Sequence, residues 1–198
     1  MNPFRMCLDC FQGPSFTQTQ SYAQFRDEAQ TVKLDTSHMG SEVVILKNGT
    51  RICGTGAALA TAPIVQNKAF FQVNVQQTGT WGIGVANRSV DLNKVPLSEN
   101  SWTLNNAGEL RGGGAVIGKA DEEITIEEGD SIGIAFDHIE LSFYKNGVRL
   151  PNAVTTVRGQ VFPVVYVDDS AILDVKFRSF SIDVPAGFEE IMLEQTLL

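Results

Sequence analysis

The sequence predicts an all-β fold, an antiparallel sandwich or barrel, and three observations support this prediction. Beyond residue 31, apolar and polar residues alternate with a period of two, as in Phe71-Gln72-Val73-Asn74, and this is the period of a half-buried strand. Such segments recur about every ten residues, with turn signals between them. The longest helical pattern is Phe188–Gln195, so we expect a short C-terminal helical segment and otherwise strands.

Turn chemistry places the connections between these strands. Asn48-Gly49 separates two strand-like runs, and Asn146-Gly147 follows another. Asn-Gly supplies the positive φ angles of a two-residue turn whose twist matches paired strands. Asp137-His138 lies between two alternating runs that are too close together for anything but a hairpin.

Two segments indicate strands that are covered on both faces. The run from Phe162 to Val167 is apolar almost throughout, which is typical of a strand buried on both sides. In the segment 81–86, WGIGVA, large residues fall on one face and Gly82, Gly84 and Ala86 on the other. Glycine weakens a strand unless another group approaches closely, so we expect the glycine face to be tightly covered.

The composition divides the chain in two. Residues 1–31 are rich in Gln, Ser and Thr without a sustained period and are interpreted as a flexible N-terminal tail. Residues 32–198 are expected to form the β-sandwich domain, with a C-terminal extension over about 181–198. Within the tail, Cys7 and Cys10 lie in an apolar cluster, and their acylation is a hypothesis for weak membrane contact.

Charge and cysteine usage exclude several classes of protein. The formal net charge is −8, which disfavours nucleic acid as a partner. The three cysteines show no disulfide framework. The sequence has neither the apolar run of a membrane span nor the pattern of a signal peptide. We therefore expect a cytoplasmic protein, monomeric and without cofactor or metal.

Five features in order resemble the SPRY domain family over about residues 32–180. They are Leu34-Asp35 with His38 and Gly40, the WGIGVA strand, Glu128-Gly129-Asp130 before Ile132-Gly133-Ile134, the Phe143…Asn146-Gly147 hairpin, and Phe162-Pro163-Val164-Val165. The resemblance implies a bent sandwich of two antiparallel sheets, a concanavalin-like jelly roll. It also implies recognition of a peptide or loop of a partner protein, without catalysis.

The same resemblance implies a binding surface made by loops at one edge. The corresponding stretches are 61–65, about 90–98, and 168–170. The first lacks the arginine, and the last the aromatic contact, that well-studied members offer; two carboxylates stand there instead. A partner at this surface would thus present basic groups or backbone amides. The candidate partner-binding residues are Ala62, Pro63, Ile64, Val90, Leu92, Tyr166, Asp168, Asp169 and Ser170.

Several of these residues have competing interpretations. Asp168-Asp169 can contact a basic partner, cap a turn by accepting backbone amides, or contribute to a calcium site, which needs more oxygen ligands than the sequence shows nearby. A lectin-like sandwich is the alternative function, in which Trp102 would stack on a sugar while the two aspartates bind its hydroxyl groups. Core burial is the other interpretation of Trp102.

Enzyme and nucleotide-binding interpretations are disfavoured. Gly82-x-Gly84 lies in a strand, and Gly112-Gly113-Gly114 has no Lys-Ser/Thr after it, so neither has the helix N-terminus that binds phosphate. The candidate nucleophile–base pair is Cys53 with His38 or His138. Cys53 is expected to be buried in a hairpin strand and His138 exposed in a turn.

Overall fold

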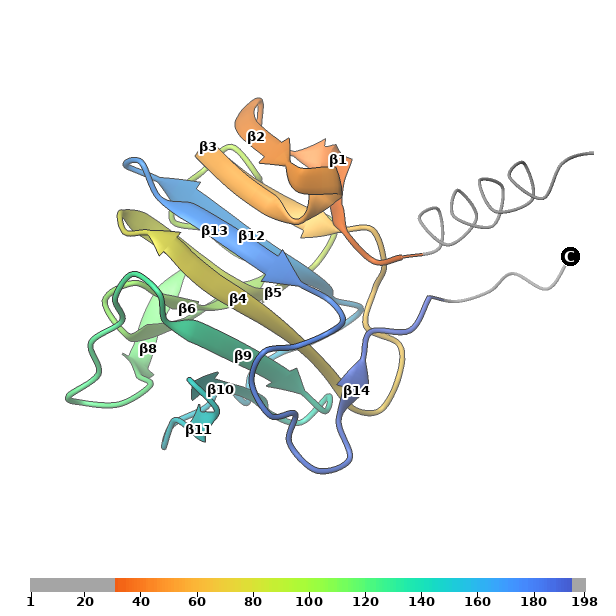
Figure 1. Cartoon of the computed structure of the whole chain (residues 1–198), viewed down its shortest axis with the longest axis vertical. Coiled ribbons are helices and arrows are strands. Elements are labelled where there is room, and N and C mark those ends of the chain that lie inside the picture. Colours follow the sequence, from red (N-terminus) through yellow and green to blue (C-terminus); the bar gives the residue numbers. More distant parts are fainter. Residues whose placement is uncertain (1–30, 194–198) are drawn as a thin grey trace, which may run out of the picture. The chain divides into compact units, whose positions relative to one another are not determined.

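The computed structural model describes residues 31–193, which form strands joined by loops and one short 3₁₀ turn (Figure 1). The first seven strands are β1 (Leu34–Met39), β2 (Glu42–Leu46), β3 (Arg51–Ala60), β4 (Ala69–Gln77), β5 (Thr80–Ala86), β6 (Ser101–Asn105) and β7 (Glu109–Gly112). The others are β8 (Ala115–Lys119), β9 (Ser131–Phe136), β10 (Leu141–Lys145), β11 (Val148–Arg149), β12 (Phe162–Asp168), β13 (Ile172–Lys176) and β14 (Glu189–Glu190). The turn η1 (Lys47–Gly49) connects β2 to β3.

The strands form one continuous, curled sheet. Its order is β11-β10-β9-β4-β13-β3-β12-β5-β6-β7-β8, with β1 and β2 also paired to β3 and β14 paired to β4. The first part of β3 pairs with β2 and β13, whereas its second part pairs with β1 and β12. Because β3 bends from one half of the sheet into the other, the expected division into two separate sheets is not confirmed. The antiparallel, all-β prediction is confirmed.

The main hydrophobic core lies between the two halves of the sheet. Alternate residues enter it from each strand: Trp81, Ile83 and Val85 from β5, and Val165 and Val167 from β12. Full burial of each such side chain is worth about 1.5–3 kcal/mol. Trp102 also belongs to this core and is 6% exposed, so its core interpretation is confirmed.

The predicted turns are present. Asn146 and Gly147 have φ angles of 50° and 86° and connect the paired strands β10 and β11. Asn48 and Gly49, with φ of 54° and 87°, lie in η1 between the paired strands β2 and β3. His138 is exposed, as expected, but Cys53 is only half-buried.

The expected C-terminal helix is wrong over its described part. In place of a helix, β14 pairs in parallel with the start of β4. The Gln66 side chain stabilises this arrangement: its Nε2 donates to the Glu190 carbonyl at 2.7 Å, and its Oε1 accepts from the Met192 amide at 2.8 Å. Ile191 is 5% exposed against the main core. These tertiary contacts outweigh a weak local helix preference.

Two predicted segments lie wholly or partly outside the described residues. Of the N-terminal tail, 1–31, which includes the proposed acylation sites Cys7 and Cys10, the structure describes only Thr31. Of the C-terminal extension, residues 194–198 are not described. Within residues 31–193, no helix is long and apolar enough to cross a membrane.

Candidate interaction surface

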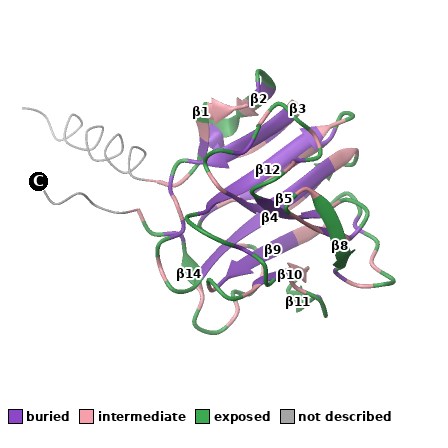
Figure 2. Ribbon diagram, turned by 180° about the vertical axis from the view of Figure 1, so that it is seen from behind, coloured by how far each residue is buried: buried purple, intermediate pink, exposed green. Residues whose placement is uncertain are grey.

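A second, smaller hydrophobic core lies on the outer face of the sheet, away from the main core. Strands β3 and β12 contribute alternate residues to it and β5 contributes Ala86. A loop over residues 87–100, here called the covering loop, lies across them. The members of this core are Ala57, Leu59, Ala86, Val90, Leu97, Phe162, Val164 and Tyr166, with Leu92 and Val95 packed against it. Strand β12 is therefore buried on both faces, as predicted (Figure 2).

Hydrogen bonds fix the covering loop at its root and at its tip. At the root, the Asn87 amide donates to the Asn100 carbonyl at 2.9 Å, and Asn87 Nδ2 donates to the Gln160 carbonyl at 2.6 Å. At the tip, the Leu92 carbonyl accepts from the Ala57 amide at 2.8 Å. Asn93 Oδ1 accepts from the Ser41 amide at 2.8 Å. Hydrogen bonds thus hold both the root and the tip of the covering loop to neighbouring parts of the domain.

Glycines permit the close approach of these layers. A Cβ on Gly82 would lie 2.2 Å from Tyr166 Cε1, and a Cβ on Gly40 would lie 2.6 Å from the Leu92 carbonyl oxygen. A Cβ on Gly84 would lie 2.1 Å from the Trp102 carbonyl oxygen. The prediction that the glycine face of the WGIGVA strand is closely covered is confirmed, and the Tyr166 ring and the β6 backbone are what cover it.

Tyr166 is not a surface contact. It is 1% exposed, and burial, opposed in part by Arg111 and by a hydrogen bond with Thr103, raises its pKa to about 12. Its ring supports the loop from below and does not reach solvent. The prediction of an aromatic contact at this position is therefore corrected.

Three other candidate residues also support the surface from within. Ala62, Ile64 and Val90 are 3%, 2% and 7% exposed. The Ile64 amide donates to the Val161 carbonyl at 2.9 Å, which ties the 61–65 stretch to the start of β12. Pro63 and Leu92 are half-buried and keep part of their surface accessible.

The stretch Asp168-Asp169-Ser170 forms a tight turn. The Ala171 amide donates to the Asp168 carbonyl at 3.0 Å, and Asp169 and Ser170 have φ angles of 50° and 66°, as in a type I′ turn. Asp168 Oδ1 accepts from Thr55 Oγ1 at 3.0 Å and from the Asp169 amide at 2.9 Å. Asp168 therefore caps the turn, whereas Asp169 and Ser170 are exposed.

The three predicted loops do not converge on one patch. Ile64 lies beside the start of β12, and the Asp168 turn follows its end. Seven residues of strand separate the two by about 20 Å. The covering loop spans this distance, with its root at the 61–65 end and its tip at the Asp168 end.

Carboxylates gather at the tip end. Thr55 of β3 connects two of them, because it pairs in register with Glu42 and its hydroxyl donates to Asp168. Asp91 lies next to Leu92, whose carbonyl accepts from the amide of Ala57, two residues from Thr55 along β3. We call the set Glu42, Thr55, Asp91, Asp168 and Asp169 the tip patch. Glu42, Asp91 and Asp169 are exposed and Asp168 is half-buried. Such an arrangement attracts cationic groups.

Sequence reasoning missed a polar cluster at the root end. Arg88 lies over the Phe162 ring, 5.3 Å from its centroid, and Arg88 Nη2 donates to His38 Nε2 at 2.8 Å. His38 Nδ1 faces Asp35 Oδ2 at 2.7 Å, which assigns the imidazole proton to Nδ1. Burial alone would raise the pKa of Asp35, but hydrogen bonds from the Ser37 amide and His38 lower it. An arginine is thus present at this end, supplied by the covering loop.

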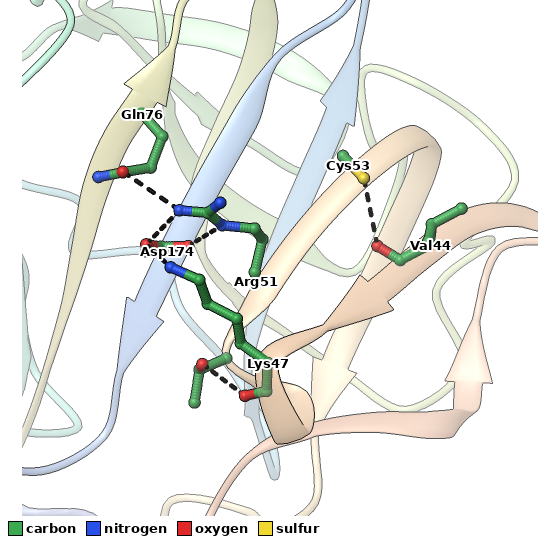
Figure 3. Close-up of polar contacts among 7 residues, drawn as sticks. Val44, Lys47, Arg51, Cys53, Gln76 and Asp174 are labelled. Atoms are coloured by element: carbon green, nitrogen blue, oxygen red, sulfur yellow. Dashed lines mark hydrogen bonds and ion pairs between the residues drawn. The ribbon is translucent and has the colours of Figure 1, made fainter.

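Metal binding, a Cys–His pair and glycan binding are the rival interpretations, and the described residues bear on each. Within residues 31–193, no group of three His, Cys, Asp or Glu side chains is placed to hold a metal. The Cys53 thiol donates to the Val44 carbonyl at 3.8 Å (Figure 3). His138 Nε2 contacts the Gln66 carbonyl, and His38 contacts Asp35 and Arg88, so the thiol and both imidazoles have other partners. Because Trp102 is buried, it cannot stack on a sugar as the lectin interpretation requires.

Comparison with known proteins defines the class. The sequence matches the SPRY domain family over residues 68–179, and the chain belongs to this family, whose members are generally non-catalytic protein-interaction modules.

The curated relatives are more specific. SPRY domain-containing protein 7 of Homo sapiens and that of Mus musculus are each 48% identical to this chain over 176 residues, covering 86% of this chain and 88% of theirs. The same protein of Gallus gallus is 46% identical over the same coverage.

Solved structures support the fold alone. The SPRY domain of human HERC1 has a TM-score of 0.62 at 16% identity, covering 74% of this chain and 99% of that one. The TRIM65 PSpry domain has a TM-score of 0.59 at 10% identity, covering 84% of this chain and 100% of that one.

Proposed function

We propose that this protein is a non-catalytic interaction module that recognises a short basic segment of a partner protein at the tip patch. The observation that carries the proposal is the gathering of four carboxylates, from Glu42, Asp91, Asp168 and Asp169, beside a loop held at both ends. Lys or Arg side chains of a partner would be attracted by this charge, and Arg can pair with a carboxylate through two parallel hydrogen bonds.

The second core supports this function because it makes the surface rigid in advance. Ordering a flexible loop on binding costs about 0.5–1.5 kcal/mol for each immobilised side chain. Here Val90 and Leu97 are already buried and the Leu92 carbonyl is already bonded to β3. A partner therefore meets a preformed surface and loses little affinity to ordering.

The candidate residues take two roles in this proposal. Leu92, Asp168, Asp169 and Ser170 are the contacts at the tip, and Pro63 is an accessible contact at the root end. Ala62, Ile64, Val90 and Tyr166 hold these elements in place from within. The proposal also includes a cytoplasmic location and a monomeric state.

Charge reversal at the tip patch tests the proposal. The variant Glu42→Lys, Asp169→Lys changes two exposed side chains and spares Asp168, which caps its turn, and Asp91, whose Oδ1 accepts from the Asn93 amide in the covering loop. The matched control is Glu122→Lys, Glu123→Lys, which makes the same change in net charge at two exposed positions of another loop. Quantitative affinity capture from cells compares each variant with the wild type.

We expect the tip variant to lose its specific partners and the control to keep them. Circular dichroism and thermal unfolding are measured to check that both variants fold. Identical partner lists for wild type and tip variant would refute the assignment of the tip patch as the binding surface.

A further inference from the structure

A pocket of about 390 Å³ lies between β1, β2 and the η1 turn, and neither the proposed function nor the family comparison uses it. Its walls come from the start of β1, the end of β2, η1 and Thr61. Those that matter for recognition are Lys33, Thr36, Ile45, Leu46, Lys47 and Asn48. We call it the β1–β2 pocket.

The β1–β2 pocket carries an excess of positive charge. Lys47 Nζ donates to Asp174 Oδ2 at 3.1 Å, and the same carboxylate accepts from Arg51 Nε at 2.5 Å and Arg51 Nη2 at 2.7 Å (Figure 3). Burial alone would raise the pKa of Asp174, but these hydrogen bonds lower it. The single negative charge of Asp174 thus neutralises only one of the two positive charges of Lys47 and Arg51.

Lys33 adds a second uncompensated cation. Its side chain is exposed, and among residues 31–193 no carboxylate pairs with its ammonium group. Asp35, the carboxylate in the pocket wall, is already engaged by the Ser37 amide and by His38. Those bonds leave the Asp35 carboxylate charged, so Lys33, Lys47 and Arg51 against Asp35 and Asp174 give a formal local charge of +1, three cations less two carboxylates. In a chain of net charge −8 this is a local reversal of sign.

The geometry also holds Lys33 in position. Gly49, with φ of 87°, packs so closely that a Cβ there would lie 2.8 Å from Lys33 Cβ. The Lys33 stem therefore rests on the η1 turn while its ammonium group reaches solvent, a common division for lysine. Restricting the stem reduces the entropy lost when the ammonium group binds an anion.

The pocket has an apolar side and neutral hydrogen-bonding groups. Leu46 is 48% exposed, and Ile45 packs partly against the main core. Thr36 and Asn48 supply hydroxyl and amide groups beside them. An apolar wall next to two lysines suits a ligand that carries an apolar side chain flanked by carboxylates.

We propose that the β1–β2 pocket binds an acidic peptide segment of a second protein, with one aliphatic side chain on Leu46 and flanking carboxylates on Lys33 and Lys47. The proposal does not depend on the tip patch, which has the opposite charge. Together the two sites would let one chain contact a basic and an acidic segment at separate places.

Nuclear magnetic resonance titration of the full chain, labelled with ¹⁵N, tests the proposal. The probe is the peptide acetyl-Glu-Glu-Leu-Asp-Glu-amide, and its control is the isosteric acetyl-Gln-Gln-Leu-Asn-Gln-amide. We expect saturable shifts at the amides of β1, the end of β2 and η1 with the acidic peptide, and at least about five-fold weaker binding of the neutral peptide, since exposed ion pairs contribute modestly.

Variants separate the pocket from a general effect of charge. Lys33→Gln, Lys47→Gln removes both proposed contacts, and Lys94→Gln removes an exposed lysine of the covering loop instead. We expect the first to weaken the acidic peptide about five-fold and the second to leave its affinity unchanged. Absence of saturable shifts up to about 10 mM peptide, a span that reaches the weakest specific affinities, would overturn the proposal. Shifts centred elsewhere, or equal affinity in the double variant, would also overturn it.

This titration is independent of the proposed function. Failure of the Glu42→Lys, Asp169→Lys variant to alter partner capture concerns the tip patch alone. Failure of the acidic peptide to bind concerns the β1–β2 pocket alone.

Discussion

Substitution of Gly82 by alanine tests how closely the outer face of the sheet is covered. A Cβ at this position would lie 2.2, 2.3 and 2.6 Å from Tyr166 Cε1, Cζ and Oη. Tyr166 is 1% exposed, between β5 and the covering loop, so its ring cannot move aside without disturbing the second core. Overpacking of this kind costs about 1–3 kcal/mol, and we expect about 2 kcal/mol.

The cost is measured as a loss of unfolding free energy in urea and as a lowered melting temperature. For a domain of this size, 2 kcal/mol corresponds to about 4–8 °C. The matched control is Gly118→Ala on β8, where a Cβ would meet no atom within 4 Å and the backbone needs no positive φ. That control should change stability by less than about 0.5 kcal/mol.

A double-mutant cycle identifies the cause. In a Tyr166→Leu background the ring is gone, so Gly82→Ala should cost less than about 1 kcal/mol, which gives a coupling energy of at least about 1 kcal/mol. Equal costs of Gly82→Ala with and without the ring would refute the reasoning, as would a cost equal to that of Gly118→Ala.

The remaining predictions concern ionisation, the root cluster and the C-terminal strand. Burial raises the pKa of Tyr166 to about 12, so its neutral form contributes stability that is complete below the unfolded pKa of about 10 and is lost as pH rises towards 12. Tyr166→Phe should therefore lack this part of the loss of stability at alkaline pH. An unchanged dependence of stability on pH in this variant would contradict the prediction. The lowered pKa values of Asp130 and Asp174 predict stability that is present above about pH 4 and lost as pH falls below it, so Asp174→Asn should flatten this acid dependence in urea titrations. Arg88→Ala removes the contacts to His38 and Phe162 and should speed hydrogen exchange in residues 87–92, whereas exchange as slow as in the wild type would show that the loop does not need them. Gln66→Ala removes both side-chain hydrogen bonds to the C-terminal segment and should speed exchange at Met192 while leaving the β9 amides unchanged; equal exchange at Met192 would argue against this anchoring.

Local patterns in the sequence were sufficient for the strands that they singled out, such as β4, β5 and β12, and for the two-sided burial of β12. Period-two alternation reports which residues of a strand face a core, and Trp81, Ile83 and Val85 follow it. Glycines opposite them signalled a close neighbour. The signal did not identify Tyr166 as that neighbour, since the register that pairs Gly82 with Tyr166 joins strands far apart in the sequence.

Long-range pairing was beyond the sequence. The distance between the 61–65 stretch and the Asp168 turn depends on β12 running antiparallel to β3, which no local pattern encodes. The Arg88–His38 contact joins residues 50 positions apart for the same reason. At the C-terminus, pairing of β14 with β4 and the Gln66 bonds decided the conformation of a segment whose local preference was helical.

Site-specific photo-crosslinking in cells tests most directly whether partners meet the tip end of the covering loop. A photoreactive amino acid replaces Lys94 or Asp169 at this end, or Glu122 in a loop elsewhere; all three side chains are exposed. The account predicts the same discrete protein adducts from positions 94 and 169 and their absence from position 122. Adducts from position 122 that match those from 94 and 169, or none from the latter two, would contradict it.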